Sequence, residues 1–255
     1  TAPAGLVGAL TGPDSLVPWL QFLRGVAAPF FNLGGDLGRG RAVESFEGVV
    51  TKAGGGAPLM VAAMRASAAH RVQELANKLP MDGVAELVSI GCGEGQHSIE
   101  LVARHPGLRA TLVDSRGPLE AAEAHARARG IADRLKFEVA DGRTWSPRQP
   151  VDVVLLSNVL HMLGPEASRS LVARCHGMLR QGGRCVVHAQ FLDDDRSAPR
   201  WATLMNLILV AATPHGANHS SSDTREWLAD AGFSPVDELR LSLWNAHGVL
   251  IGHAR

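Results

Sequence analysis

From residue 84 to the end of the chain, short apolar runs alternate with longer stretches in which apolar residues recur every three or four positions. The run 151–157 (VDVVLLS) is almost wholly apolar, which is typical of a strand buried on both faces of a parallel sheet. The longer stretches have the spacing of amphipathic helices. The pattern predicts strands at 84–90, 109–113, 135–140, 151–157, 184–190, 236–241 and 247–253, and helices at 96–105, 118–129, 166–179, 200–211 and 223–231. This alternation predicts an α/β fold, with a mostly parallel sheet covered by helices on both faces.

The start of the chain lacks this alternation and has the pattern of a helical segment. Apolar residues recur at helical spacing in 16–31 and 59–79, and a shorter helical pattern covers 44–50. We therefore expect two parts, a helical segment at 1–80 and an α/β domain at 81–255.

Three alternating glycines follow the first predicted strand and stand directly before the helix predicted at 96–105. A strand that ends on glycines before a helix leaves backbone N–H groups unpaired and open to close approach by a ligand. Asp114 ends the next strand about twenty residues later, where nucleotide-binding βαβ units place a carboxylate on ribose hydroxyls. The spacing Gly91-x-Gly93-x-Gly95 differs from the dinucleotide pattern G-x-G-x-x-G, which disfavours a nicotinamide-dependent oxidoreductase. The alternative is a purely structural turn.

The composition narrows the class of protein. Basic and acidic residues number 25 each, which gives no support to nucleic acid or an anionic membrane surface as a partner. The apolar runs are too short to cross a bilayer. Cys92, Cys175 and Cys185 lack the spacing of a metal site, and the chain opens without the pattern of a secretory signal. We therefore expect a reduced, cytoplasmic protein.

The motifs around and after the glycines follow one another in the order LVSIGCGEG, TLVDS, VADGRTW, VDVVLLSNVLHML and MLRQGGRCVVHAQFL. In this order they resemble the class I S-adenosylmethionine (SAM)-dependent methyltransferases, and more narrowly the small-molecule O-methyltransferase family of plants and bacteria. The resemblance runs from about Leu6 to the C-terminus and implies a Rossmann-like, seven-stranded sheet of order 3-2-1-4-5-7-6. It also implies SAM as the cofactor, and methyl transfer to a hydroxyl of a hydrophobic aromatic or polyketide-like small molecule in specialised metabolism.

Members of this family carry a winged-helix dimerisation domain before the SAM domain. Residues 1–16 resemble the end of that domain, so we expect most of it to lie outside this chain. The resemblance implies a homodimer when that domain is present. It also makes the helical segment 1–80 a linker that contributes to the acceptor pocket, and it places one wall of that pocket on the missing domain.

The resemblance assigns the SAM contacts to the carboxyl ends of the predicted strands, where open α/β sheets bind ligands. The glycines would border the methionine part of SAM, Asp114 would bind both ribose hydroxyls, and Asp141 would lie near the adenine amino group. Ser89 departs from the family, which carries Asp or Glu there, so we expect lower SAM affinity unless Glu94 compensates. The complete SAM set is Gly91, Gly93, Gly95, Asp114, Ser115, Asp141, Gly142, Arg143, Ser157 and Asn158.

His161 follows the strand 151–157 and matches the catalytic His of the plant enzymes' His-Asp-Trp run. An imidazole with an ordinary pKa of about 6.5 can take the proton of an attacking phenol. The plant enzymes orient this His with two glutamates, but the corresponding positions near Ala189 and Asn218 are not acidic here. His188 or His219 could therefore act instead, and a structural helix-start histidine is the alternative for His161.

Four histidines, His161, His188, His215 and His219, could converge on one pocket. Their spacing matches no metal motif, so we interpret them as polar lining and expect no metal. The family builds its acceptor pocket from the helices before the SAM core and after the fifth strand, although plain core packing is the alternative for apolar residues there. The residues expected near the acceptor are Met205, Asn206, His188, His219 and Trp201.

Other functions stay open at this point. Some members of this family bind SAM and catalyse a non-methylating rearrangement or decarboxylation instead, and a nucleotide-binding regulator without catalysis is a further alternative. The sequence does not distinguish methylation of oxygen, carbon or nitrogen.

Overall fold

The computed structural model of the chain describes residues 15, 17, 18, 20, 21, 24, 56–213, 215–242 and 247–255. Residues 17, 18, 20, 21 and 24 are helical, and the rest of the helix expected at 16–31 lies outside the described residues, as does the helix expected at 44–50. By its contacts the chain divides into two compact units, Thr1–Arg71 with Asn206–Gly216 and Val72–Met205 with Ala217–Arg255. The division at 80/81 stays a prediction.

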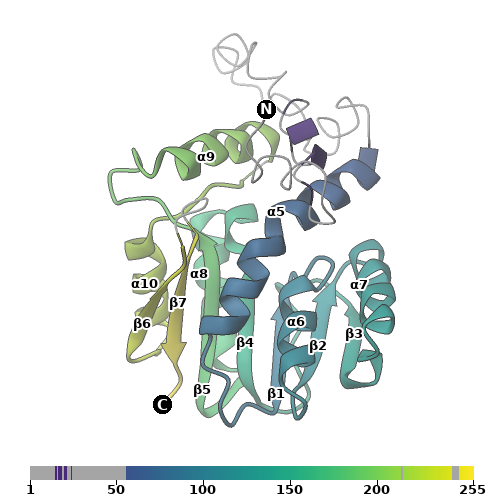
Figure 1. Cartoon of the computed structure of the whole chain (residues 1–255). Coiled ribbons are helices and arrows are strands. Elements are labelled where there is room, and N and C mark those ends of the chain that lie inside the picture. Colours follow the sequence, from purple (N-terminus) through teal and green to yellow (C-terminus); the bar gives the residue numbers. More distant parts are fainter. Residues whose placement is uncertain are drawn as a thin grey trace. The chain divides into compact units, whose positions relative to one another are not determined.

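A seven-stranded sheet of order β3-β2-β1-β4-β5-β7-β6 forms the second unit, which confirms the predicted order (Figure 1). All neighbouring strands are parallel except β7, which runs antiparallel to β5 and β6. The strands are β1 (Glu86–Ile90), β2 (Arg109–Asp114), β3 (Leu135–Val139), β4 (Val151–Ser157), β5 (Leu179–Gln190), β6 (Val236–Arg240) and β7 (His247–His253).

The predicted helices after residue 84 are confirmed, each within a few residues. Among the strands, only β5 starts well before the predicted start at residue 184. Leu179 already pairs with Val151, and the pair Gly182–Gly183 lies at an irregularity of the register inside the strand, not in a turn before it. The helices are α5 (Gly56–Lys78), α6 (Gln96–Arg104), α7 (Arg116–Ala128), α8 (Pro165–His176), α9 (Arg200–Ala212) and α10 (Ser221–Asp230), with 3₁₀ turns η2 (Ala132–Arg134) and η3 (Leu160–Met162).

The sheet separates two apolar layers because successive side chains of a strand point to opposite faces. Val153 and Leu155 of β4 pack with the last turns of α5 and with α6 and α7, whereas Val154 and Leu156 pack with α8 and α10. This two-sided burial explains why the run 151–157 is apolar throughout. Figure 1 shows α6 on the near side of the sheet and α8 and α10 behind it.

A carboxylate network ties α6 to its surroundings. Glu100 is 7% exposed and accepts a 2.7 Å bond from Arg104 Nε and 3.1 Å bonds from both terminal nitrogens of Arg129. Burial raises the pKa of the Glu100 carboxyl, but the hydrogen bonds from Arg104 and Arg129 outweigh it, so the pKa lies below its usual value. A carboxyl with a lower pKa in the folded state contributes stability above its unfolded pKa and loses that contribution as the pH falls.

We expect Glu100→Gln to lower the free energy of unfolding by about 1–2 kcal/mol at pH 7. The difference from the parent chain should shrink as the pH falls below about 4, where the carboxyl is protonated. Urea unfolding at pH 7 and at a pH below about 4 measures this difference in the free energy of unfolding. Glu120→Gln, at an exposed position on α7, is the matched control. An equal loss at both pH values would show that the contribution is not electrostatic.

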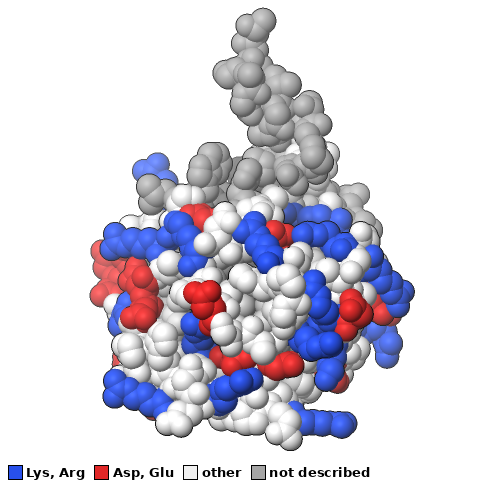
Figure 2. All heavy atoms as spheres, turned by 60° about the horizontal axis from the view of Figure 1, so that its bottom comes forward, with Lys and Arg blue, Asp and Glu red and all other residues white. Residues whose placement is uncertain are grey.

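The surface carries charges of both signs. Figure 2, which brings forward the lower end of Figure 1, shows basic and acidic side chains interspersed over the described face. In the described part of the chain, no helix has both the length and the apolar character to cross a membrane.

Candidate functional site

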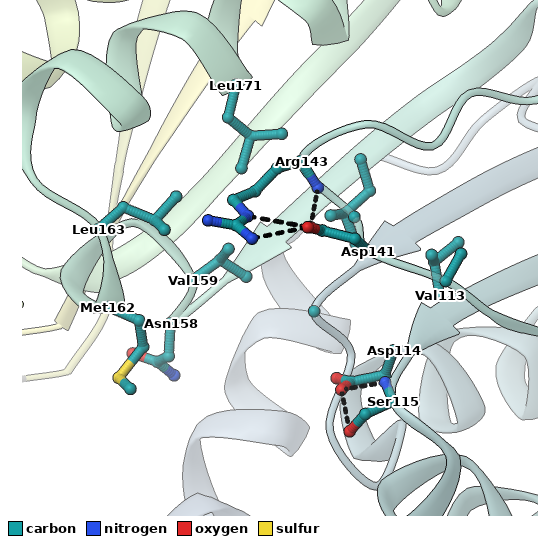
Figure 3. A pocket seen from close by; sticks show the side chains of 14 residues that line it. Val113, Asp114, Ser115, Asp141, Arg143, Asn158, Val159, Met162, Leu163 and Leu171 are labelled. Atoms are coloured by element: carbon teal, nitrogen blue, oxygen red, sulfur yellow. Dashed lines mark hydrogen bonds and ion pairs between the residues drawn. The ribbon is translucent and has the colours of Figure 1, made fainter. Parts of the chain in front are cut away.

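A pocket of about 350 Å³ opens at the carboxyl ends of β1, β2, β3 and β4 (Figure 3). Its volume falls in the range of small-molecule sites. Seven of the ten residues predicted to bind SAM line it: Gly91, Asp114, Ser115, Asp141, Gly142, Arg143 and Asn158. The lining residues that sequence reasoning missed are apolar, namely Ile90, Val113, Ala140, Val159, Met162, Leu163 and Leu171.

The glycine turn between β1 and α6 needs a left-handed backbone, since φ is +62° at Gly91, +57° at Gly93 and +69° at Gly95. Gly91 lines the pocket, and a Cβ there would lie 2.9 Å from Val159 Cγ2. Gly95 is buried and is the N-cap residue of α6. The turn therefore keeps its shape only with residues that tolerate positive φ.

Asp114 ties this turn to the end of β2. Its Oδ2 accepts a 2.8 Å bond from the Gly93 N–H, and its Oδ1 accepts from the Ser115 N–H at 2.7 Å and from the Ser115 hydroxyl at 3.2 Å. A carboxylate offers about four acceptor positions. The Ser115 hydroxyl can rotate away, so Asp114 keeps acceptor capacity for two hydroxyl donors of a ligand.

Asp141 and Arg143 form an exposed pair on the other side of the pocket (Figure 3). Arg143 Nη2 lies 2.7 Å from Asp141 Oδ2, and its Nε lies 3.0 Å from Oδ1. The hydrogen bonds from Arg143 hold the pKa of Asp141 below its usual value. Arg174 of α8 fixes the loop that follows, donating to the carbonyls of Thr144 and Trp145 at 2.7 and 3.2 Å.

The end of β4 carries a second polar group beside the pocket. Asn158 is a non-glycine residue with a left-handed backbone (φ +56°), and its N–H donates to the His188 carbonyl at 2.8 Å. Such outliers occur often at functional sites. Ser157 does not line the pocket, and its Oγ lies 2.8 Å from His188 Nδ1 and 3.4 Å from His97 Nδ1.

Two imidazoles flank the Ser157 hydroxyl, and a third packs against one of them. The His188 ring lies 5.0 Å from the His97 ring and 5.0 Å from the His247 ring, measured between centroids. We call His97, His188 and His247, with Ser157, the imidazole cluster. Sequence reasoning named His188 but missed His97 and His247, because only the pairing of β5 with β7 brings His247 beside His188. The available signal was that His97 stands two residues after the last glycine of the turn.

His161 lies in η3 and is not among the residues that line the pocket, although its neighbours Met162 and Leu163 are. Its Nδ1 is buried and has no hydrogen-bond partner in the described part of the chain. Burial, and then the nearby His219, lower the pKa of His161 to about 4.

His219 forms hydrogen bonds with the backbone of the turn that carries His161. Its Nε2 lies 3.1 Å from the Leu160 carbonyl and 3.2 Å from the Leu163 carbonyl, and its ring packs edge-on against Trp227. Carbonyls accept hydrogen bonds only, so Nε2 carries the proton and donates. Burial lowers the pKa of His219.

The other predicted acceptor residues lie on α9. Trp201 and Met205 belong to the unit with the sheet, whereas Asn206 and the exposed His215 belong to the other unit. Their contact with an acceptor stays a prediction. Ser89, where the family pattern departs, is buried in β1 at 2% exposure. Among the described residues, no group of three or more His, Cys, Asp or Glu side chains has the arrangement of a metal site.

Comparison with known proteins agrees with this geometry. The family model "O-methyltransferase domain" matches residues 38–234. A 3-hydroxy-5-methyl-1-naphthoate 3-O-methyltransferase of Streptomyces sahachiroi is 32% identical over 71% of this chain and 52% of its own length. The aclacinomycin 10-hydroxylase RdmB of Streptomyces purpurascens is 36% identical over 54% of this chain and 38% of its own length.

Among solved structures, the apo form of the S-adenosylmethionine-dependent methyltransferase SibL superimposes with a TM-score of 0.79 at 26% identity, over 92% of this chain and 74% of that one. The chain spans about half the length of the first of these curated relatives. The family match covers most of the chain and includes the whole pocket. The chain therefore belongs to the O-methyltransferase domain family, whose members use SAM.

Proposed function

We propose that this protein transfers the methyl group of SAM to a hydroxyl of a hydrophobic aromatic or polyketide-like small molecule. The observation that carries the proposal is the pocket itself, where Asp114 is held by the glycine turn at one side and Asp141 follows β3 at the other. This arrangement offers one carboxylate to ribose hydroxyls and a second acceptor to an adenine amino group.

The residues present fit SAM. Asp114 retains acceptor positions for two hydroxyls, and Val159, Leu163 and Leu171 supply apolar walls for a flat base. The left-handed Gly93 has open space where a Cβ would lie, so its backbone can be approached closely. Asn158 would bring an amide to the end of the pocket that Figure 3 shows away from Asp114.

When bound, SAM supplies a methyl group made electrophilic by its sulfonium. This chain's own residues would act mainly by holding the two reactants in line and excluding water, effects that lower a barrier without a specialised catalytic group. A base must still receive the proton of the acceptor hydroxyl. The sequence pattern assigns this role to His161, but its lowered pKa makes it a weak base at neutral pH.

The acceptor class is supported by the relative that methylates a hydroxynaphthoate, according to its name, and by the apolar side of the pocket. Methylation of a carbon beside a phenol hydroxyl would use the same kind of site. We also propose a cytoplasmic location, and a homodimer formed through an N-terminal domain of the family's type.

A second candidate is a non-methylating rearrangement or decarboxylation of the substrate, with SAM bound in the pocket. One of the relatives is named a hydroxylase, which favours keeping this candidate. The absence of acidic residues at the positions that orient the plant enzymes' His points the same way.

Calorimetric titration tests the donor site shared by both candidates. We expect the purified protein to bind SAM and its product S-adenosylhomocysteine (SAH) at one site per chain, and to give no saturable heat with NAD⁺. Binding of NAD⁺ in place of SAH would overturn the proposal in favour of an oxidoreductase.

A further inference from the structure

The imidazole cluster lies on the sheet face covered by the last turns of α5 and by α6 and α7, at the carboxyl end of β4. Ser157 and His188 are register neighbours on parallel β4 and β5, so their side chains share this face. His247 pairs with Gln190 on antiparallel β7 and reaches the same face. His188 is fully buried and His247 is 8% exposed, so the cluster is largely withdrawn from water.

Asn158 links the cluster to the pocket. It follows Ser157 directly and lines the pocket, and its Oδ1 lies 3.2 Å from His247 Nε2. The backbone N–H of Asn158 also donates a hydrogen bond to the backbone carbonyl of His188. The cluster therefore adjoins the end of the pocket that Figure 3 shows away from the ribose-side carboxylate of Asp114.

The geometry around Ser157 allows a proton to pass between two rings. Its hydroxyl has one proton and lies between two Nδ1 atoms, those of His188 and His97. The hydroxyl oxygen can accept from two Nδ1–H groups, but a proton passes between the rings only when the hydroxyl donates to one Nδ1 and accepts from the other. The two rings then take opposite tautomers, and we assign this arrangement to the neutral cluster. An added proton can then shift between the rings through the hydroxyl, with its charge shared over both.

We propose that the imidazole cluster, and not His161, receives the proton of the acceptor hydroxyl. As the O–C bond forms and the donor's C–S bond breaks, the C–S electron pair stays on sulfur and the O–H proton passes to the cluster. For each methyl group transferred, the acceptor hydroxyl releases one proton and the imidazole cluster takes up that proton. The inference rests on the proposed function.

The alternative base has an unfavourable environment. Burial lowers the pKa of His161 to about 4, and its neighbour His219 is occupied with the carbonyls of the turn. A base is most effective when its pKa lies near the working pH. The cluster is buried as well, but it can share an added proton between two rings through the Ser157 hydroxyl, whereas the Nδ1 of His161 has no hydrogen-bond partner among the described residues.

Nitrogen NMR of histidine-labelled protein in complex with SAH tests the arrangement without any turnover. We expect one of His97 and His188 to carry a proton on Nδ1 and the other to carry none. Ser157→Ala should remove this opposition. The same state of Nδ1 on both rings of the parent chain, whether both protonated or both unprotonated, would overturn the inference.

Methyl-transfer kinetics at saturating SAM test the role. The probes are a simple hydroxynaphthoate and an acidic nitrophenol that is ionised at the assay pH. With the hydroxynaphthoate, Ser157→Ala and His188→Gln should each lower kcat roughly 100-fold, whereas with the ionised nitrophenol the loss should nearly vanish because no proton has to be removed. His161→Gln should lose less than about tenfold.

The controls separate the possible failures. His253→Gln changes the opposite end of β7 and should leave kcat unchanged. His188 is fully buried, so His188→Gln can fail to fold, and thermal unfolding checks this. If that variant does not fold, Ser157→Ala gives the decisive result, because it keeps all three rings. Equal losses with both probes would show a structural role only and overturn the inference while the proposed function stands. A parent chain that methylates no member of a panel of hydroxylated aromatic acceptors would remove both the inference and the proposed function.

Discussion

Asp114→Ala is expected to weaken SAH binding roughly 100-fold, which corresponds to about 2.7 kcal/mol. Hydrogen bonds to a charged acceptor contribute about 1.5–3 kcal/mol each, and this carboxylate has room for two ribose hydroxyls. It also holds the Gly93 N–H at 2.8 Å, so its loss loosens the turn that borders the ligand. Calorimetric titration with SAH gives the dissociation constants directly.

Two further variants make this result specific. Asp114→Asn keeps one oxygen but loses the charge, and we expect a loss of about tenfold. Asp133→Ala, at an exposed position in η2, should bind SAH as the parent chain does. If Asp114→Ala bound SAH with unchanged affinity while remaining folded, the pocket would not be the SAM site.

Gly95→Ala is expected to lower the free energy of unfolding by roughly 2–4 kcal/mol. A left-handed backbone costs a residue with a Cβ about 1–2 kcal/mol, and overpacking a core adds about 1–3 kcal/mol. At Gly95 φ is +69°, and a Cβ would lie 2.5 Å from Leu112 Cδ2 and 3.3 Å from the Ala122 Cβ. Leu112 is fully buried and cannot move aside freely.

The matched control is Gly83→Ala. Gly83 has nearly the same backbone, with φ at +71°, but nothing lies within 4 Å of the position of its Cβ. Urea unfolding of the two variants therefore separates backbone strain from crowding, and we expect Gly83→Ala to cost only about 1 kcal/mol. Equal losses would contradict the close packing of Gly95 against Leu112.

The elements that the sequence predicted well are those whose signal is local. The apolar run 151–157 is β4 to the residue, since a strand buried on both faces needs an apolar residue at nearly every position. Gly91 and Asp114 line one pocket, which the glycine spacing and the carboxyl ends of parallel strands already suggested, and their contact with SAM stays a prediction. The strand order came from the family resemblance.

The features that escaped the sequence depend on contacts between distant segments. His247 comes beside His188 only through the antiparallel register of β7 on β5. The weak basicity of His161 follows from its burial near His219, which no spacing in the sequence reveals. The apolar pocket residues Leu163 and Leu171 have the sequence pattern of ordinary core positions, and only the three-dimensional structure shows that they line the pocket.

The most direct test of the central claim is incubation with methyl-deuterated SAM and a panel of hydroxylated aromatic acceptors, followed by mass spectrometry of the products. We predict that one acceptor gains the deuterated methyl on a hydroxyl oxygen, with one SAH formed per product molecule. Conversion of an acceptor without label in the product, while SAM stays intact, would contradict methyl transfer and favour a non-methylating reaction in the same pocket.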